Sequence, residues 1–179
     1  MFRRAGIPVI DADLVSRKVS APGGRAYSSI VLEFGDGILL SDGCIDRKKL
    51  GGIVFSDPAR RKRLEALTHP AILEAVREYL EKLSENGCGA AMVEAALIHE
   101  SGVEEMFDAI VLVRCGEETQ IARVMERDKI SRGQALARME AQMNADLLAP
   151  GADHVIDNSG SIDDTRAQVE RIARILLGR

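Results

Sequence analysis

Two acidic residues follow a short apolar run near the start of the sequence. The run Gly6-Ile7-Pro8-Val9-Ile10 ends at Asp11-Ala12-Asp13, and its composition predicts a brief buried strand. In open α/β sheets, ligands bind at the carboxyl ends of the strands. A carboxylate at such a position can accept a proton from a substrate hydroxyl during phosphoryl transfer. The alternative interpretation is that Asp13 forms a helix cap or a turn.

Arginines recur within one later segment, at Arg123, Arg127, Arg132 and Arg138. Arg123 and Arg127 lie on one face of a predicted helix, so both guanidinium groups can reach the same phosphate chain and offset its charge. Arg123 could instead pair with Glu126, one turn further on. The acids beside Arg127 are its sequence neighbours, and we expect them to point away from it. Because exposed ion pairs contribute little to stability, such pairing would not explain the cluster.

The spacing of apolar residues predicts the helices that position these groups. A short helix follows Asp13 and stops at Ala21-Pro22-Gly23-Gly24, and a second begins at Tyr27. His69-Pro70 interrupts the apolar pattern of the next long segment, which predicts that one helix ends there and that Pro70 opens another. The other predicted helix starts are Asp46, Asp57, Glu117, Ser131 and Ser161.

Short apolar runs predict the strands. The runs at 90–93, 107–113 and 154–156 join the run that precedes Asp11, and the longest is rich in β-branched residues. The order of elements is strand, several helices, strand, strand, helices, strand, helix. This order predicts one domain of the α/β class, with a parallel sheet and a helical insertion between the first two strands.

Composition restricts the possible functions. The 179 residues are 46% hydrophobic but only 3% aromatic, without Trp, which suits helices packed on a parallel sheet and disfavours a sandwich or barrel. The net charge of -4 predicts no partner that is a nucleic acid or a membrane surface. The basic run Arg60-Arg61-Lys62-Arg63 is typical of a solvated helix face.

Cysteine usage and hydropathy bear on the compartment. Cys44, Cys88 and Cys115 are an odd number with unrelated spacing, which predicts neither a disulfide framework nor a zinc site and favours a reducing cytosol. No apolar stretch approaches the ~20 residues that a membrane span needs, and the amino terminus has no apolar signal core. We therefore expect a soluble cytoplasmic protein.

Several motifs, each weak alone, resemble the dephospho-CoA kinase family in their order and spacing. The resemblance covers essentially the whole sequence and rests on 6–13 with Arg17, 67–70, 94–102, 123–128, Gln142 and 155–158. It implies a P-loop kinase that uses ATP and Mg²⁺ to phosphorylate the ribose 3′-hydroxyl of dephospho-CoA. It also implies one kinase domain with a three-layer parallel sheet of the P-loop nucleoside-kinase type. Its parts would be a core at 1–13, 88–127 and 150–179, a helical CoA-binding insertion at about 14–87 and a lid at about 128–149.

The resemblance implies a role for each matching residue. It makes Asp13 the catalytic base and places Arg17 and His69 beside the acceptor substrate. His69 has an alternative role as a cap or a packed side chain. The partners are small molecules, dephospho-CoA and ATP, and no side chain is assigned as a direct metal ligand. The remaining roles are contact with the phosphates of ATP for Arg123, Arg127, Arg132 and Arg138, and a position near the adenine for Asn158.

Two positions near the second predicted strand need separate interpretation. Glu94 matches an acidic position of the family at a strand end, where it could act on Mg²⁺ through water or be a solvated turn carboxylate. The segment Ala96-Leu97-Ile98-His99-Glu100 lacks a Pro that the family usually has, and His99 replaces an apolar residue. We expect His99 to be a partly exposed side chain rather than a new catalytic group.

The family's phosphate-binding loop, Gly-x-x-x-x-Gly-Lys-Ser/Thr, occurs nowhere in the sequence. In these kinases the loop follows the first strand, its backbone N–H groups cradle the phosphates, and its Lys and Ser or Thr contact the phosphates and Mg²⁺. Met1-Phe2-Arg3-Arg4-Ala5-Gly6 is similar to the end of the helix that follows the loop. We therefore expect that the sequence begins at an internal Met and lacks the first strand, the loop and most of the first helix.

Such a chain would bind ATP poorly, and its exposed strand edges would favour association or partial disorder. A comparison of its kinase activity with that of a chain extended upstream tests this expectation, which equal activities would contradict. Two alternative functions stay open. One is another small-molecule or nucleoside kinase of the same fold, and phosphorylation of nucleoside monophosphates would distinguish it. The other is a non-catalytic remnant that binds CoA-like ligands without turnover.

Overall fold

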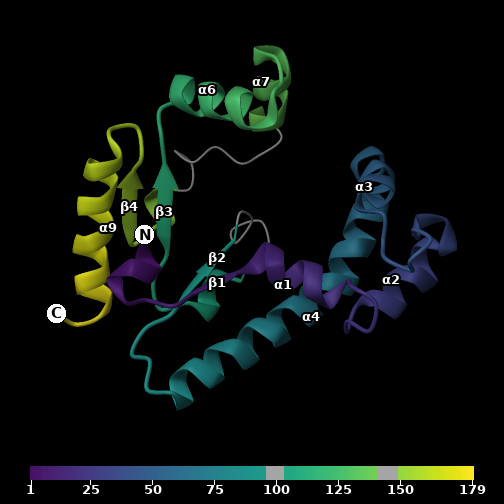
Figure 1. Cartoon of the computed structure of the whole chain (residues 1–179), viewed down its shortest axis with the longest axis horizontal. Coiled ribbons are helices and arrows are strands. Elements are labelled where there is room, and N and C mark those ends of the chain that lie inside the picture. Colours follow the sequence, from purple (N-terminus) through teal and green to yellow (C-terminus); the bar gives the residue numbers. More distant parts are fainter. Residues whose placement is uncertain (96–102, 141–148) are drawn as a thin grey trace. The chain divides into compact units, whose positions relative to one another are not determined.

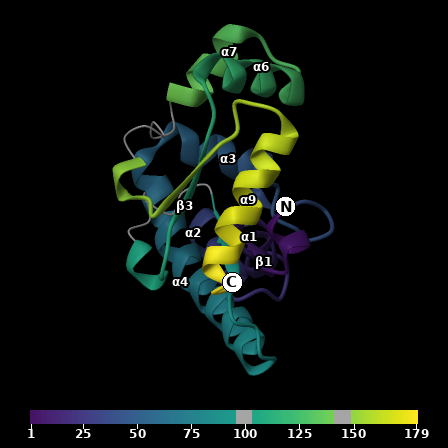
Figure 2. The same ribbon diagram turned by 90° about the vertical axis from the view of Figure 1, so that its left-hand side faces the viewer.

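The computed structural model describes residues 1–95, 103–140 and 149–179 (Figures 1 and 2). The chain divides into two compact units: Pro8–Ala95, which we call the helical unit, and Met1–Ile7 with Ala96–Arg179, which we call the carboxyl-terminal unit. Each unit contains one pair of parallel strands accompanied by helices. The α/β class and the parallel strands predicted from the sequence are therefore confirmed.

The strand pair of the helical unit consists of β1 (Val9–Asp11) and β2 (Met92–Glu94). The sequence predicted the second strand at 90–93, two residues too early. Because β1 has only three residues, the ladder pairs only three positions of its partner, and the two preceding alanines lie outside it. The chain passes directly from β1 into α1 (Ala12–Val19).

Three α-helices follow α1 in the helical unit, and two of them begin at the predicted caps. The side chain of Asp46 accepts hydrogen bonds from the first backbone N–H groups of the second of these helices, and Asp57 does the same for the third. The elements are α2 (Tyr27–Phe34), the 3-10 turn η2 (Asp36–Ile38), α3 (Arg47–Ser56) and α4 (Pro58–Glu85).

Pro70 lies inside α4, which continues through the predicted break. The prediction of two separate helices at this point was wrong. Proline lacks the N–H that would bond to the carbonyl four residues earlier, and in a helix interior it costs about 3 kcal/mol. Apolar side chains on both sides of the proline, including Leu64, Ile72 and Val76, pack into one core. This tertiary packing outweighs the local preference.

The core of the helical unit lies between its helices and β1. α1 contributes Val15 and Val19, one turn apart, and packs against α4. The side of α1 that carries these valines is therefore buried, and the opposite side is left for other roles. The buried residues of this core are Ile10, Val15, Val19, Ala26, Ile30, Ile38, Leu50, Val54 and Val76.

The strand pair of the carboxyl-terminal unit consists of β3 (Val111–Arg114) and β4 (His154–Asp157). The sequence predicted the first of these at 107–113, but the ladder begins later because β4 offers only four partners. The N–H of Ile110 instead donates to the Asp153 carboxylate at 2.7 Å. The ladder also ends one residue later than predicted at each strand.

Helices follow both strands of this unit, and the predicted starts at Glu117 and Ser161 are confirmed. Ser161 and Asp164 form a reciprocal capping box at the start of the last helix. That helix lies beside β4 (Figure 1) and packs on β4 and η1. The elements are η1 (Phe2–Ala5), η3 (Glu104–Met106), α6 (Glu117–Asp128), α7 (Arg132–Glu140), η4 (Ala149–Gly151) and α9 (Ile162–Leu176).

Within the three described ranges, no helix has the length and apolar character that crossing a membrane requires. His99 and Gln142, which the sequence patterns singled out, lie outside the described residues.

Candidate active-site residues

Asp11 ends β1 and is also the N-cap of α1. Its Oδ1 accepts a hydrogen bond from the backbone N–H of Leu14 at 3.0 Å. In the parallel ladder Asp11 lies opposite Glu94, the last residue of β2. Two carboxylates therefore end neighbouring strands at the edge where α/β sheets bind ligands. Because Asp11 caps the helix, Asp13 does not have to.

Asp13 lies in the first turn of α1, and its side chain is exposed. Its carboxylate has no hydrogen bond or ion pair within the described part of the chain. A negative charge is favourable in the first turn of a helix. The arrangement leaves a solvent-accessible carboxylate that can accept a proton from a bound hydroxyl.

Arg17 lies one turn after Asp13, on the same side of α1. It is exposed, and it too has no hydrogen bond or ion pair to any residue that the structure describes. A carboxylate and a guanidinium on one exposed face can contact a single ligand that carries both a hydroxyl and an anionic group. The structure thus brings these two predicted residues together.

Arg47, the first residue of α3, is a candidate that the sequence patterns did not indicate. Its Nη2 donates to Ser20 Oγ, 3.5 Å away, just after α1. Partial burial lowers the pKa of Arg47, and the nearby Arg17 guanidinium lowers it further. Two arginines from different helices therefore lie close together. The available sequence signal was the basic run 47–49 in the first turn of a helix, where cations are disfavoured.

His69 lies within α4 and is half-buried. The imidazole has no hydrogen bond or ion pair among the residues described. Because α4 continues through Pro70, a cap role for His69 is excluded. A packed side chain and a substrate contact both fit this position.

Arg123 and Arg127 both lie on α6, as predicted, but their surroundings differ. The alternative pair between Arg123 and Glu126 does not occur, and Arg123 has no acidic partner in the described ranges. Arg127 contradicts the expectation that its neighbours point away. Its Nε and Nη2 donate to the two carboxylate oxygens of Asp128 at 2.7 and 2.9 Å. Asp128 is the last residue of α6, and Lys129 turns left-handed, so helical geometry no longer separates the two side chains.

Arg132 forms a second two-pronged pair. Its Nη1 and Nη2 donate to the carboxylate of Glu118 at 2.8 and 2.6 Å, joining α7 to α6. The hydrogen bond raises the pKa of Arg132 and lowers that of Glu118. Both side chains are largely exposed, so the pair contributes little to stability. A phosphate, which offers the same paired oxygens, can take the place of the carboxylate.

Asn158 directly follows β4. Its backbone N–H donates to the carbonyl of Arg114 at 2.7 Å, and its Oδ1 accepts from the buried Thr165 hydroxyl at 3.0 Å. Nearby, the Gly116 N–H donates to Ser159 Oγ at 2.8 Å. These contacts join the loops that follow β3 and β4 at the carboxyl edge of the pair. The side chain of Asn158 is thereby held at a ligand-binding edge.

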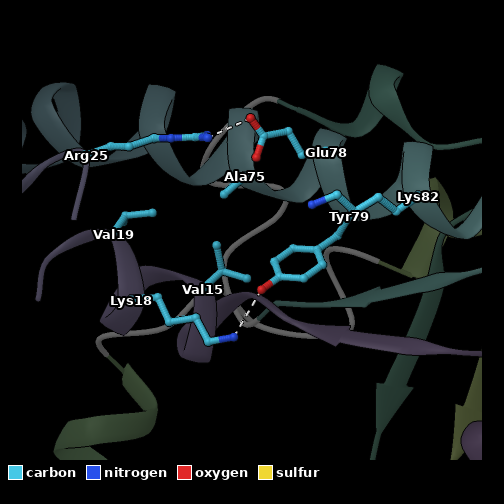
Figure 3. A pocket seen from close by; sticks show the side chains of 8 residues that line it. All are labelled: Val15, Lys18, Val19, Arg25, Ala75, Glu78, Tyr79 and Lys82. Carbon is cyan, nitrogen blue, oxygen red and sulfur yellow. Dashed lines mark hydrogen bonds and ion pairs between the residues drawn. The ribbon is translucent and has the colours of Figure 1, made fainter. Parts of the chain in front are cut away.

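A hollow of about 180 Å³ lies between α1 and α4, on the buried side of α1 (Figure 3). Its basic side chains are largely engaged. Arg25 pairs with Glu78 at 2.6 Å and with Glu74 at 3.3 Å, and Lys18 Nζ donates to the Tyr79 hydroxyl at 3.0 Å. Lys18 and Arg17 are neighbours, yet Lys18 contacts α4 whereas Arg17 has no such contact. The hollow is therefore a junction between packed helices, and the unengaged groups of α1 lie elsewhere.

The chain matches a known family over most of its length. The family model described as dephospho-CoA kinase matches residues 1–164. A dephospho-CoA kinase of Symbiobacterium thermophilum is 43% identical over 178 residues, which are 99% of this chain and 74% of that protein. A dephospho-CoA kinase of Geobacter sulfurreducens is 44% identical over 172 residues, which are 96% of this chain and 87% of that protein.

Two solved structures are also similar to this chain. A dephospho-CoA kinase from Campylobacter jejuni superposes with a TM-score of 0.71 at 31% identity, covering 98% of this chain and 88% of that one. The protein TT1252 from Thermus thermophilus superposes with a TM-score of 0.80 at 30% identity, covering 97% of this chain and 87% of that one.

Proposed function

The chain belongs to the dephospho-CoA kinase family, and on that premise we propose how its own residues carry out the reaction. The activity is ATP-dependent phosphorylation of the ribose 3′-hydroxyl of dephospho-CoA, which gives CoA and ADP. The observation that carries the assignment of residues is the exposed, unengaged carboxylate of Asp13, in the first turn of α1 and two residues after the end of β1.

Asp13 is the proposed base. It accepts the proton of the 3′-hydroxyl as the oxygen bonds to the γ-phosphorus of ATP, while the bond from that phosphorus to the β-phosphate oxygen breaks and ADP leaves. Carboxylates in this position contribute mainly by orienting the hydroxyl and receiving its proton. Support comes from the place of Asp13 at the carboxyl end of a strand and from its lack of a competing partner.

Arg123, Arg127 and Arg132 are the proposed contacts to the phosphates of ATP. Arg123 has no acidic partner in the described ranges, whereas the other two are held in two-pronged pairs, Arg127 by the partly buried Asp128 and Arg132 by the exposed Glu118. Those carboxylates occupy the places that phosphate oxygens take when nucleotide binds. The guanidinium groups then stabilise the charge that moves onto the leaving ADP.

Three other residues have proposed binding roles. Arg17 and His69 contact the acceptor, and Asn158 lies near the adenine. For Arg17 the support is its position one turn from Asp13. For Asn158 it is the fixed loop at the carboxyl edge of β3 and β4.

A magnesium ion fits the carboxylates that end β1 and β2. Asp11 and Glu94 are register partners, and Mg²⁺ takes one or two carboxylates together with water and substrate phosphates. In the described part of the chain, no group of three or more His, Cys, Asp or Glu is placed to hold a metal ion by itself. When bound, such an ion supplies positive charge to the phosphates of ATP.

We also propose how the chain is divided into a nucleotide-binding core, a substrate-binding insertion and a lid. The proposed architecture consists of a three-layer sheet of the P-loop nucleoside-kinase type, a CoA-binding insertion at about 14–87 and a lid at about 128–149. The independent compactness of the helical unit, Pro8–Ala95, supports a separate substrate-binding part. The 179 residues contain no Gly-x-x-x-x-Gly-Lys-Ser/Thr motif, so the arginines above are the phosphate contacts that this proposal assigns.

The test is phosphate transfer by wild type, Asp13→Asn and the matched control Asp36→Asn. Asp36 is another exposed aspartate of the helical unit without a side-chain partner among the described residues. Each protein is measured with dephospho-CoA and with nucleoside monophosphates, as the 179-residue chain and as a form that also carries any in-frame upstream residues. Faster use of nucleoside monophosphates would favour another kinase of this fold. Binding of dephospho-CoA without turnover in either form would favour a non-catalytic role.

A further inference from the structure

Arg17 and Arg47 form a pair of like charges that comes from separate helices. Arg47 begins α3 and reaches Ser20 Oγ at 3.5 Å, and Ser20 immediately follows α1, one turn beyond Arg17. Ser20 is only 9% exposed, and Arg47, which is itself exposed, contacts it at the end of α1. The Arg17 charge is close enough to disfavour the charge on Arg47. The fold thus holds two guanidinium groups near each other although they repel.

Neither guanidinium is neutralised by a carboxylate in the described ranges. Some other arginines of the helical unit have acidic partners, such as Arg25 with Glu74 and Glu78 and Arg63 with Glu33, whereas Arg77 has none among the described residues. An unneutralised pair held together by the fold is a local conflict, and such conflicts concentrate at functional sites. An anion between the two groups would resolve it, because a guanidinium binds phosphate oxygens in a two-pronged geometry.

The position of this pair limits which anion it serves. Asp13 and Arg17 share one face of α1 and are separated by one turn, about 6 Å along the helix axis. A ligand that places a hydroxyl at Asp13 therefore presents a nearby anionic group to Arg17 and Arg47. The acceptor substrate has this combination, since its ribose carries the 3′-hydroxyl and, on the 5′ side, a diphosphate.

We propose that Arg17 and Arg47 together bind the 5′-diphosphate of the acceptor substrate, and that Arg47 is a residue that determines specificity for a diphosphate-bearing acceptor. This inference rests on the proposed function, because it uses the acceptor of that reaction. It adds a second cation, from α3, to the single arginine that the sequence indicated. It also explains why α3 begins with an arginine despite the unfavourable position.

The test measures ligand binding by titration calorimetry for wild type, Arg17→Gln, Arg47→Gln and Arg47→Lys. Arg77→Gln is the control, since Arg77 is an exposed arginine of α4 without a side-chain partner among the described residues and loses the same charge. The probes are dephospho-CoA, inorganic diphosphate, and pantetheine, which carries no phosphate. Binding is informative with or without turnover.

We expect Arg17→Gln and Arg47→Gln each to weaken dephospho-CoA binding by about 10- to 100-fold and to abolish competition by inorganic diphosphate. Arg47→Lys, which keeps the charge but loses the two-pronged geometry, falls between wild type and Arg47→Gln. Binding of pantetheine is unchanged in all variants. Arg77→Gln changes every Kd by less than about twofold.

Two outcomes overturn the inference, and a third separates it from the proposed function. Wild-type affinities in Arg47→Gln, or an equal loss in Arg77→Gln, would remove the role of this pair. If either result is found and wild type still phosphorylates dephospho-CoA, the proposed function is retained and only the role of Arg17 and Arg47 is rejected. If Arg47-dependent diphosphate binding is found but dephospho-CoA is neither bound nor phosphorylated, the proposed function fails and the assignment to the acceptor fails with it.

Discussion

Asp11 lies opposite Glu94 in the parallel ladder of β1 and β2, so a carboxylate ends each of two neighbouring strands. The two residues nevertheless differ in their surroundings. Asp11 caps α1 through the N–H of Leu14 at 3.0 Å, whereas Glu94 is exposed at the end of its strand. Because Asp11 caps the helix, Asp13 in its first turn is not needed as a cap.

The cap role of Asp11 predicts a loss of stability that Asp13 does not share. Asp11→Ala leaves the Leu14 N–H without its acceptor and lowers the free energy of unfolding by about 1 kcal/mol. Asp11→Asn keeps an acceptor oxygen and most of the stability. Asp13→Ala changes it by less than about 0.5 kcal/mol. Urea unfolding measures all three, and equal losses for the two alanine variants would contradict the assignment of the cap.

Replacement of Pro70 is predicted to raise the stability of the protein, whereas replacement of Asp11 lowers it. Pro70→Ala restores an N–H inside α4 and removes the clash of the ring, so we expect the free energy of unfolding to rise by about 1 to 3 kcal/mol. The control is Pro58→Ala in the first turn of the same helix, where no intrahelical bond is missing and the change is small. Thermal and urea unfolding provide the comparison. A loss of stability in Pro70→Ala would show that the packing of α4 depends on the proline ring.

The helix caps were predictable from the sequence because their signals are local. Asp46, Asp57 and Ser161 each cap the helix that follows, as their residue types indicated. Strand limits were less predictable, since the length of a ladder depends on the partner strand. The continuity of α4 through Pro70 was also hidden, because it results from packing on both sides of the proline.

In the candidate site, too, the features that depend on local sequence were predictable and those that depend on tertiary packing were not. Asp13 and Arg17 follow from the sequence, because residues four apart on a helix share a face. Arg47 does not, because its proximity to Arg17 depends on how α3 meets the end of α1. The Arg127–Asp128 pair was missed for a different reason. Ideal helix geometry separates adjacent side chains, but α6 ends at Asp128.

Asp164 predicts a pH dependence of stability. Hydrogen bonds from the Ser161 side chain and backbone lower the pKa of the Asp164 carboxyl from the ordinary 3.8. A group whose pKa is lower in the folded state contributes stability above its unfolded pKa, and this contribution is lost as the pH falls through the folded value. The stability of wild type should therefore exceed that of Asp164→Ala by the largest amount above about pH 4.

Thermal unfolding between pH 7 and pH 3 checks this prediction. The gap between wild type and Asp164→Ala should narrow as the solution is acidified below pH 4. The control is Asp108→Ala, since Asp108 is exposed and has no side-chain partner among the described residues. A gap that stays constant over this range would mean that the charge of Asp164 does not matter to the cap.

The arginines of α6 predict selective loss of nucleotide use. Arg123→Gln and Arg127→Gln should each lower kcat/KM for ATP by about tenfold or more, because each removes a charged contact to the phosphates. Arg171→Gln on α9 is the control, since Arg171 is exposed and has no side-chain partner in the described part of the chain. Initial rates at varied ATP give the values. Equal effects in all three variants would indicate a general loss of charge rather than phosphate contact.

The most direct test of the account is the rate of phosphate transfer from ATP to dephospho-CoA by wild type and Asp13→Asn. We predict CoA as the product and a fall in kcat by about 100-fold or more in Asp13→Asn, with Asp36→Asn near wild type and nucleoside monophosphates used far more slowly. A wild-type kcat in Asp13→Asn, measured in a form of the protein that turns over, would contradict the central claim.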